Sequence, residues 1–144
     1  MNKPFILESD NAVFFDCDDT LCIWNPTQEQ AERGIKFNNY GYEVNLVPHL
    51  RHIESLKLHK ARNHRIVVWS AGGWEWAKEV VKVLELTEYV DVIMSKPKWV
   101  YDDLPASSFI PEANRIWKKD SDKEEIKECN STQTIDELED KYIP

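Results

Sequence analysis

The sequence has no apolar run close to the ~20 residues that a membrane-spanning helix requires. Its first ten residues also become polar too early for a secretory signal peptide. Basic residues are outnumbered, with 18 Lys and Arg against 26 Asp and Glu and a formal net charge of −8. We therefore expect a cytoplasmic protein that makes no membrane contact and does not bind duplex nucleic acid mainly by charge, while readout of one nucleotide or of a strand end stays open.

Cysteine is scarce as well. The chain has three cysteines, Cys17, Cys22 and Cys129, and none of them is in a Cys-x-x-Cys spacing. An odd number without a secretory signal favours reduced thiols over disulfides. Two nearby cysteines alone do not make a zinc site.

Short apolar runs dominate what is present. Hydrophobic residues make up 42% of the 144-residue chain, which is enough for the core of one domain. Runs without polar alternation are typical of strands buried in a parallel sheet. The runs predicted as strands are Ala12–Phe15, Ile66–Trp69, Val90–Met94 and Trp99–Tyr101.

Helical spacing separates these runs. One predicted helix carries Leu46, Leu50, Ile53 and Leu56, with Pro48 in its first turn. The other carries Trp74, Ala77, Val81 and Leu84, with Trp74 facing inward. The alternation predicts an α/β protein with a Rossmann-like, doubly wound parallel sheet. Ligands of such sheets bind beyond the carboxyl ends of the strands.

Two segments fall outside this alternation. Residues 23–45 are predicted to form a small flap, built on a hairpin over Ile35–Val44 with Asn and Gly at the turn. The main domain is expected to span 1–117, with an edge strand at Asn114–Trp117. A charged and partly flexible tail, 118–144, would follow and would carry a short helix at Thr134–Tyr142.

All four histidines lie between His49 and His64, among several basic residues. We expect them on the solvated face of the first helix. Two alternatives stay open, namely a metal site from His49 and His52 or a contact to a polyanion.

Carboxylates crowd the end of the first predicted strand. Asp16, Asp18 and Asp19 fall within four positions, and like charges so close together are costly unless a cation or a proton neutralises them. Mg²⁺ prefers carboxylate oxygens. Two aspartates one residue apart can also divide the roles of nucleophile and acid.

This run, with Thr20, resembles the Asp-x-Asp-x-Thr motif of the haloacid dehalogenase-like (HAD) phosphohydrolases. The resemblance implies that Asp16 is the nucleophile, forming an aspartyl-phosphate, and that Asp18 is the general acid and then the base. The family's second motif, a strand ending in Ser or Thr, is matched at Ser70, whose hydroxyl would hold the phosphoryl group.

The family's fourth motif, an apolar strand ending in paired aspartates, is matched by Asp102 and Asp103. The resemblance implies that Asp102 joins Asp16 and the carbonyl of Asp18 on Mg²⁺, with Asp103 acting directly or through water. The predicted metal residues are therefore Asp16, Asp18, Asp102 and Asp103.

The family's charge-neutralising lysine is matched at Lys96, with Lys98 as the alternative. Lys96 and Asp102 could not both reach the metal along one straight strand, because six residues at ~3.3 Å each span ~20 Å. The chain must loop back after Lys96 or use another base.

The flap is small, and family members with this open type of site are often associated with large substrates. We expect a phosphorylated substrate, either a nucleotide or a 3′-phosphate end of a nucleic acid. The predicted substrate contacts are Thr20, Ala71, Trp24 and Trp76, with the two tryptophans offered as stacking surfaces for a base. The alternatives are a protein phosphatase of the same family and a phosphate-binding module without catalysis.

Overall fold

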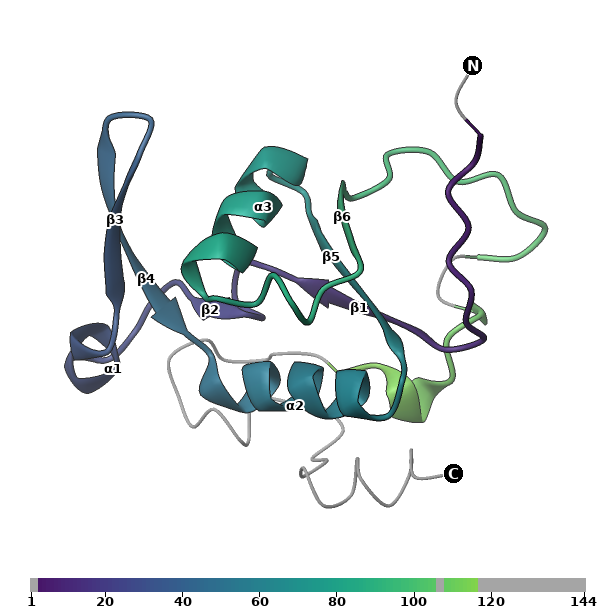
Figure 1. Ribbon diagram of the computed structural model, residues 1–144, viewed down its shortest axis with the longest axis horizontal. Coiled ribbons are helices and arrows are strands. Elements are labelled where there is room, and N and C mark those ends of the chain that lie inside the picture. The colour runs from purple at the N-terminus through teal and green to yellow at the C-terminus, as the bar shows by residue number, and fades with distance from the viewer. Residues whose placement is uncertain (1–2, 106–107, 117–144) are drawn as a thin grey trace.

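A computed structural model describes residues 3–105 and 108–116, and the tail predicted at 118–144 lies outside them. The described part is a mixed α/β structure (Figure 1). Its helices and strands, in chain order, are β1 (Ala12–Asp16), β2 (Cys22–Ile23), α1 (Gln28–Glu32), β3 (Ile35–Asn39), β4 (Tyr42–Pro48), α2 (Leu50–Ala61), β5 (Arg65–Ser70), α3 (Trp74–Val83), β6 (Val92–Ser95) and a short 3-10 helix, η2 (Glu112–Asn114).

The core of the structure is a three-stranded parallel sheet in the order β1-β5-β6. Its register pairs Asp16 with Trp69 and Ser70 with Ser95, so the three strands end at one edge. The prediction of an α/β fold with a parallel sheet is therefore confirmed. The strand predicted at Val90–Met94 starts two residues late, as β6.

Both long helices cover the same face of this sheet. Ile66 and Val68 of β5 share one buried cluster with Leu56 of α2 and with Ala77 and Val80 of α3. Because alternate strand residues point to opposite faces, the other face carries Phe14 and Trp69, whose rings are 4.5 Å apart. The second helical layer of a doubly wound sheet is not found among the described residues.

The hairpin predicted within the flap is confirmed, and it belongs to an antiparallel sheet in the order β2-β4-β3 with α1 beside it. Tyr40 and Gly41 form its two-residue turn, both with positive φ (50° and 89°), which suits the twist of a hairpin. In Figure 1 the flap projects to the left of the parallel sheet. The sequence did not predict β2 or α1, which are two and five residues long.

The first long helix starts later than predicted. Leu46 and Pro48 belong to β4, and α2 begins at Leu50 with His49 as its N-cap, because the hairpin strand continues through Pro48. In α3, Ala77, Val80 and Val81 face the core, whereas Trp74 is 52% exposed, so the inward orientation predicted for Trp74 is wrong.

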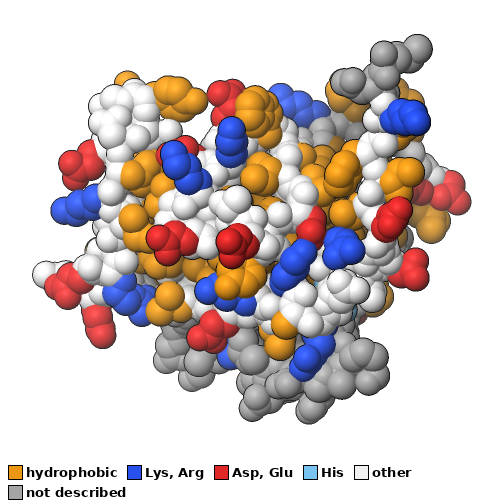
Figure 2. Space-filling model, in the orientation of Figure 1, with side chains coloured by type: hydrophobic (Ala, Val, Ile, Leu, Met, Phe, Trp, Pro, Cys, Tyr) orange, Lys and Arg blue, Asp and Glu red, His pale blue; other side chains and the backbone are white. Residues whose placement is uncertain are grey.

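The fourth predicted strand is not formed. Trp99, Val100 and Tyr101 have no strand partner in the described structure, and Tyr101 is 94% exposed. In Figure 1 the segment after β6 runs to the right, away from the flap. Figure 2 shows apolar side chains exposed on that side of the molecule. The edge strand predicted at Asn114–Trp117 is also wrong in its described part, because Asn114 closes η2.

Candidate active site

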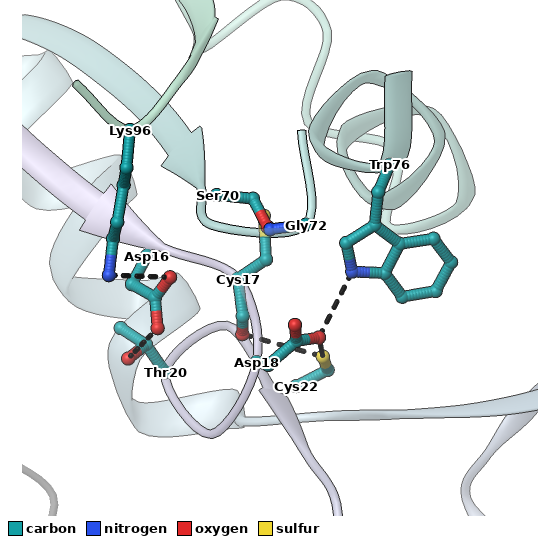
Figure 3. A network of polar contacts seen from close by, with 9 residues as sticks. All are labelled: Asp16, Cys17, Asp18, Thr20, Cys22, Ser70, Gly72, Trp76 and Lys96. Carbon is teal, nitrogen blue, oxygen red and sulfur yellow. Dashed lines mark hydrogen bonds and ion pairs between the residues drawn. The ribbon is translucent and has the colours of Figure 1, made fainter. Parts of the chain in front are cut away.

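Polar side chains meet at the carboxyl edge of the parallel sheet. Asp16 ends β1, Ser70 ends β5 and Ser95 ends β6. Figure 3 shows Asp16, Asp18, Ser70, Trp76 and Lys96 gathered around this edge. The position agrees with the rule that open parallel sheets bind ligands beyond their carboxyl ends.

The loop after β1 is closed tightly on itself. The carbonyl oxygen of Cys17 accepts the backbone N–H groups of Thr20, Leu21 and Cys22 at 3.1, 2.9 and 3.1 Å. Asp19 allows the turn by adopting a positive φ of 59°, a conformation that aspartate tolerates better than most residues. The loop thus fixes the backbone from which the side chains of Asp16 and Asp18 project.

Helix α2 braces this loop through two histidines. The Nδ1–H of His52 donates to the Thr20 carbonyl oxygen at 2.7 Å, and the backbone N–H of His49 donates to Leu21 O at 2.8 Å. The two imidazoles stack in parallel at 3.7 Å. All four histidines are buried, so the prediction of a solvated histidine face is wrong.

Lys96 reaches the carboxylate of Asp16. Its Nζ lies 3.2 Å from Asp16 Oδ1, while the hydroxyl of Thr20 donates to Asp16 Oδ2 at 3.4 Å. The chain carries Lys96 there because its backbone N–H continues the β5–β6 pairing, donating to Ser70 O at 2.9 Å. Of the two lysines considered from the sequence, the structure brings Lys96 to the site.

Asp18 points away from Asp16, toward α3 (Figure 3). Its Oδ1 accepts the indole N–H of Trp76 at 3.0 Å, and the thiol of Cys22 lies 4.0 Å from the same oxygen. The two carboxylates therefore have different partners, a cation and a hydroxyl for Asp16 and an indole for Asp18. Such a difference is what two carboxylates with divided roles require.

Ser70 is buried, and its hydroxyl oxygen accepts the backbone N–H of Gly72 at 3.0 Å. The chain then enters α3 through Gly73, whose φ of 105° favours glycine. Ser95, which the sequence analysis did not single out, accepts the N–H of Trp74 at 2.9 Å and so caps the first turn of α3 from β6. Ser95 could have been found from the sequence, because it directly precedes Lys96 at the end of a predicted apolar strand.

The thiols beneath the loop are kept neutral. Burial, with help from the neighbouring acids, raises the pKa of Cys22 to about 12 and raises the pKa of Cys17 further. Both cysteines are free, as predicted, and a protonated buried thiol is neither a nucleophile nor a metal ligand. Cys129 lies outside the described residues.

Asp102 and Asp103 do not join the site in this structure. They lie in the exposed segment after β6, where Asp102 Oδ1 accepts the N–H of Leu104 at 3.2 Å. Within residues 3–105 and 108–116, no three His, Cys, Asp or Glu side chains are grouped to hold a metal ion. Of the four predicted metal residues, the described structure places Asp16 and Asp18 at the carboxyl edge of the sheet and leaves Asp102 and Asp103 in the exposed segment.

Two of the four predicted substrate contacts lie at the carboxylates, and the other two are exposed beside them. Thr20 and Trp76 face the two carboxylates, as described above. Ala71 is exposed in the turn after β5, and Trp24 is 56% exposed, with its backbone N–H donating to Asp19 Oδ1 at 2.9 Å.

The described chain has no helix of the length and apolar character needed to cross a bilayer. No family model, curated protein or solved structure matches this chain. The function is therefore inferred from the residues at the carboxyl edge of the sheet, namely Asp16, Asp18, Ser70, Trp76 and Lys96.

Proposed function

We propose that this protein is a Mg²⁺-dependent phosphomonoester hydrolase of HAD type that works through an aspartyl-phosphate on Asp16. The observation that supports this most is the Asp16 carboxylate at a parallel strand end, 3.2 Å from the ammonium of Lys96. A lysine beside a nucleophilic carboxylate can offset the charge of an incoming phosphate, which a carboxylate alone would repel. We also propose that the parallel sheet belongs to a complete Rossmann-like, doubly wound fold.

In the first step, a carboxylate oxygen of Asp16 attacks phosphorus, and the bond from phosphorus to the leaving oxygen breaks. Asp18 delivers its proton to that oxygen, giving a neutral alcohol. In the second step, water attacks phosphorus, its proton passes to Asp18, and the bond to Asp16 breaks to release inorganic phosphate. Lys96 and the hydroxyls of Thr20 and Ser70 stabilise the charge on the phosphoryl oxygens.

The residues present suit a magnesium ion. Mg²⁺ is usually bound by one or two carboxylates and keeps several waters, and the Asp16 carboxylate and the backbone carbonyl of Asp18 would be its ligands from one short loop. When bound, the ion would withdraw charge from the phosphoryl oxygens. Asp102 and Asp103 would take part only if their segment moved to this edge.

We propose that the site is open, because the flap is the only insertion that the described residues add beside the loop after β1. We propose a nucleotide or the 3′-phosphate end of a nucleic acid as the substrate. The half-exposed ring of Trp24, next to the carboxylate loop, supports this class, because a base can stack on an exposed indole. The ring of Trp76 is less open, since it already stacks on Phe37.

The test is a screen of phosphomonoesters with Mg²⁺, with a chelator as the control. The panel should hold an aryl phosphate, nucleoside monophosphates, 3′-phosphorylated oligonucleotides, sugar phosphates and phosphopeptides. We expect turnover that chelation abolishes and kcat/KM values that favour the nucleotides. Turnover that survives chelation would contradict the metal dependence. Preference for phosphopeptides would favour the protein phosphatase, and phosphate binding without turnover would favour the binding module.

A further inference from the structure

Trp76 connects three parts of the molecule. It lies in the first turns of α3, its indole N–H donates to Asp18 Oδ1 at 3.0 Å, and its ring stacks on Phe37 of β3. The ring centroids of Trp76 and Phe37 are 6.4 Å apart with an interplanar angle of 21°. A second contact, from the hydroxyl of Tyr40 to Glu75 Oε2 at 3.4 Å, ties the tip of the same hairpin to α3.

The orientation of this ring follows from two contacts. One face stacks on Phe37, and the N–H is hydrogen-bonded to Asp18 Oδ1. The turn after β5 passes near the ring, since a methyl group added at Gly72 would lie 3.5 Å from it. Figure 3 shows that N–H aimed at the Asp18 carboxylate.

The chemistry of the donor makes the contact specific. An indole N–H only donates, so the Asp18 oxygen that it meets must accept. Oδ1 is thereby engaged, and Oδ2 is left as the oxygen that carries and transfers a proton. A freely rotating carboxylic acid would present either oxygen in many directions.

We propose that Trp76 is a positioning residue for proton transfer, which holds Asp18 so that Oδ2 faces the leaving oxygen, and that Phe37 of the flap keeps the indole in place. This inference rests on the proposed function, in which Asp18 is the general acid. It gives the flap a role in catalysis in addition to bordering the site.

Proton delivery matters most when the leaving group is a poor one. An alkyl phosphate releases an alkoxide that must be protonated, whereas an aryl phosphate releases a stable phenolate. Loss of the indole N–H should therefore affect alkyl phosphates more than aryl phosphates. A purely structural role of Trp76 would affect both alike.

The decisive variant is Trp76→Phe, which removes the N–H and keeps an aromatic ring against Phe37. We expect kcat on an alkyl phosphate to fall ~10–100-fold, less than the ~10²–10⁴-fold that a general acid itself contributes, and kcat on an aryl phosphate to fall no more than a few-fold. The matched control is Trp74→Phe, two residues earlier on the same helix, where Trp74 is 52% exposed. In an Asp18→Asn background, Trp76→Phe should have no further selective effect.

A second readout does not need turnover. The indole N–H resonance of Trp76, assigned by its loss in Trp76→Phe, reports on the hydrogen bond to Asp18 in the full chain. Asp18→Asn should move that resonance, whereas Asp19→Asn should leave it in place. Equal losses on both substrates, or an indole resonance that is indifferent to Asp18→Asn, would overturn the positioning role. Absence of turnover on the whole panel would overturn the proposed function instead, even if the resonance follows Asp18.

Discussion

Two predicted strand ends carry aspartates in this sequence, and only one of them ends a strand in the structure. Asp16 ends β1, which pairs with β5 along its whole length from Ala12 to Asp16. Asp102 and Asp103 follow the apolar run Trp99–Tyr101, which has no strand partner in the described structure and in which Trp99 is 81% exposed. An apolar run that precedes an aspartate in the sequence is therefore not enough to put that aspartate at the edge of the sheet.

The difference has a physical cause. A strand is stabilised when its backbone groups are paired and its side chains meet those of a neighbour. β5 offers β1 a partner whose side chains Ile66 and Val68 are fully buried. The segment after β6 receives neither contribution, since it leaves the sheet directly after Lys96. Carboxylates gather into a site only where their strands are paired.

The largest expected effect is that of Asp16→Asn at the paired strand end. The substitution keeps the size of the side chain and removes the nucleophile, so kcat on an aryl phosphate should fall by at least ~10³-fold. Circular dichroism and the melting temperature should stay close to those of the wild type. A variant with near-normal kcat would show that Asp16 is not the nucleophile.

A slightly smaller loss is expected from Lys96→Met. Removal of the ammonium 3.2 Å from Asp16 takes away one preorganised positive charge, and kcat should fall ~10²–10³-fold. Lys98→Met, in the segment that leaves the sheet, is the matched control and should be nearly silent. If Lys98→Met were the more damaging of the two, the segment would have to return to the site during turnover.

Acid should lower the free energy of unfolding through His59, a buried histidine of α2. Burial, together with the neighbouring His64, lowers the pKa of His59 from 6.5 to about 4. Above pH ~6.5 the histidine is neutral in both states. As the pH falls from 6.5 toward 4, the unfolded chain binds a proton that the folded chain does not, so the free energy of unfolding should drop by about 3 kcal/mol.

Urea unfolding at pH 7, 5.5 and 4.5 measures this loss, and His59→Gln should flatten it. The segment after β6 provides the contrast, because amide hydrogens of Trp99–Tyr101 should exchange fast at each pH. An unfolding free energy that is constant over this range would contradict the buried state of His59. Protected amides in Trp99–Tyr101 would show that the segment is paired after all.

The smallest effect is expected from the double substitution Asp102→Asn with Asp103→Asn. In the described arrangement both side chains lie away from Asp16, so kcat should fall less than ~10-fold at saturating Mg²⁺. The Mg²⁺ dependence of kcat is the measurement to make. A loss as large as that of Asp16→Asn, relieved at high Mg²⁺, would place these aspartates on the metal and would remove the contrast between the two strand ends.

Local patterns in the sequence predicted much of this structure. The apolar runs predicted β1, β5 and β6, and the Asn-Asn-Tyr-Gly sequence predicted the hairpin, because period, length and turn chemistry are set by neighbouring residues. The phase of α3 was predicted only in part. Ala77 and Val81 face the core as expected, but Trp74 does not, because a large indole before the first full turn can point to solvent without exposing the core.

The sequence by itself determined which groups stand at strand ends, namely Asp16, Ser70 and Lys96 just beyond β6, since these positions follow from where apolar runs stop. Only the tertiary structure decided which of them meet. The 3.0 Å contact of Asp18 with Trp76 joins residues 58 positions apart, and no local pattern encodes it. The same holds for Lys96 reaching Asp16 while Asp102 does not, because pairing of β1 with β5 and of β5 with β6 brings the first two together and leaves the third without a partner strand.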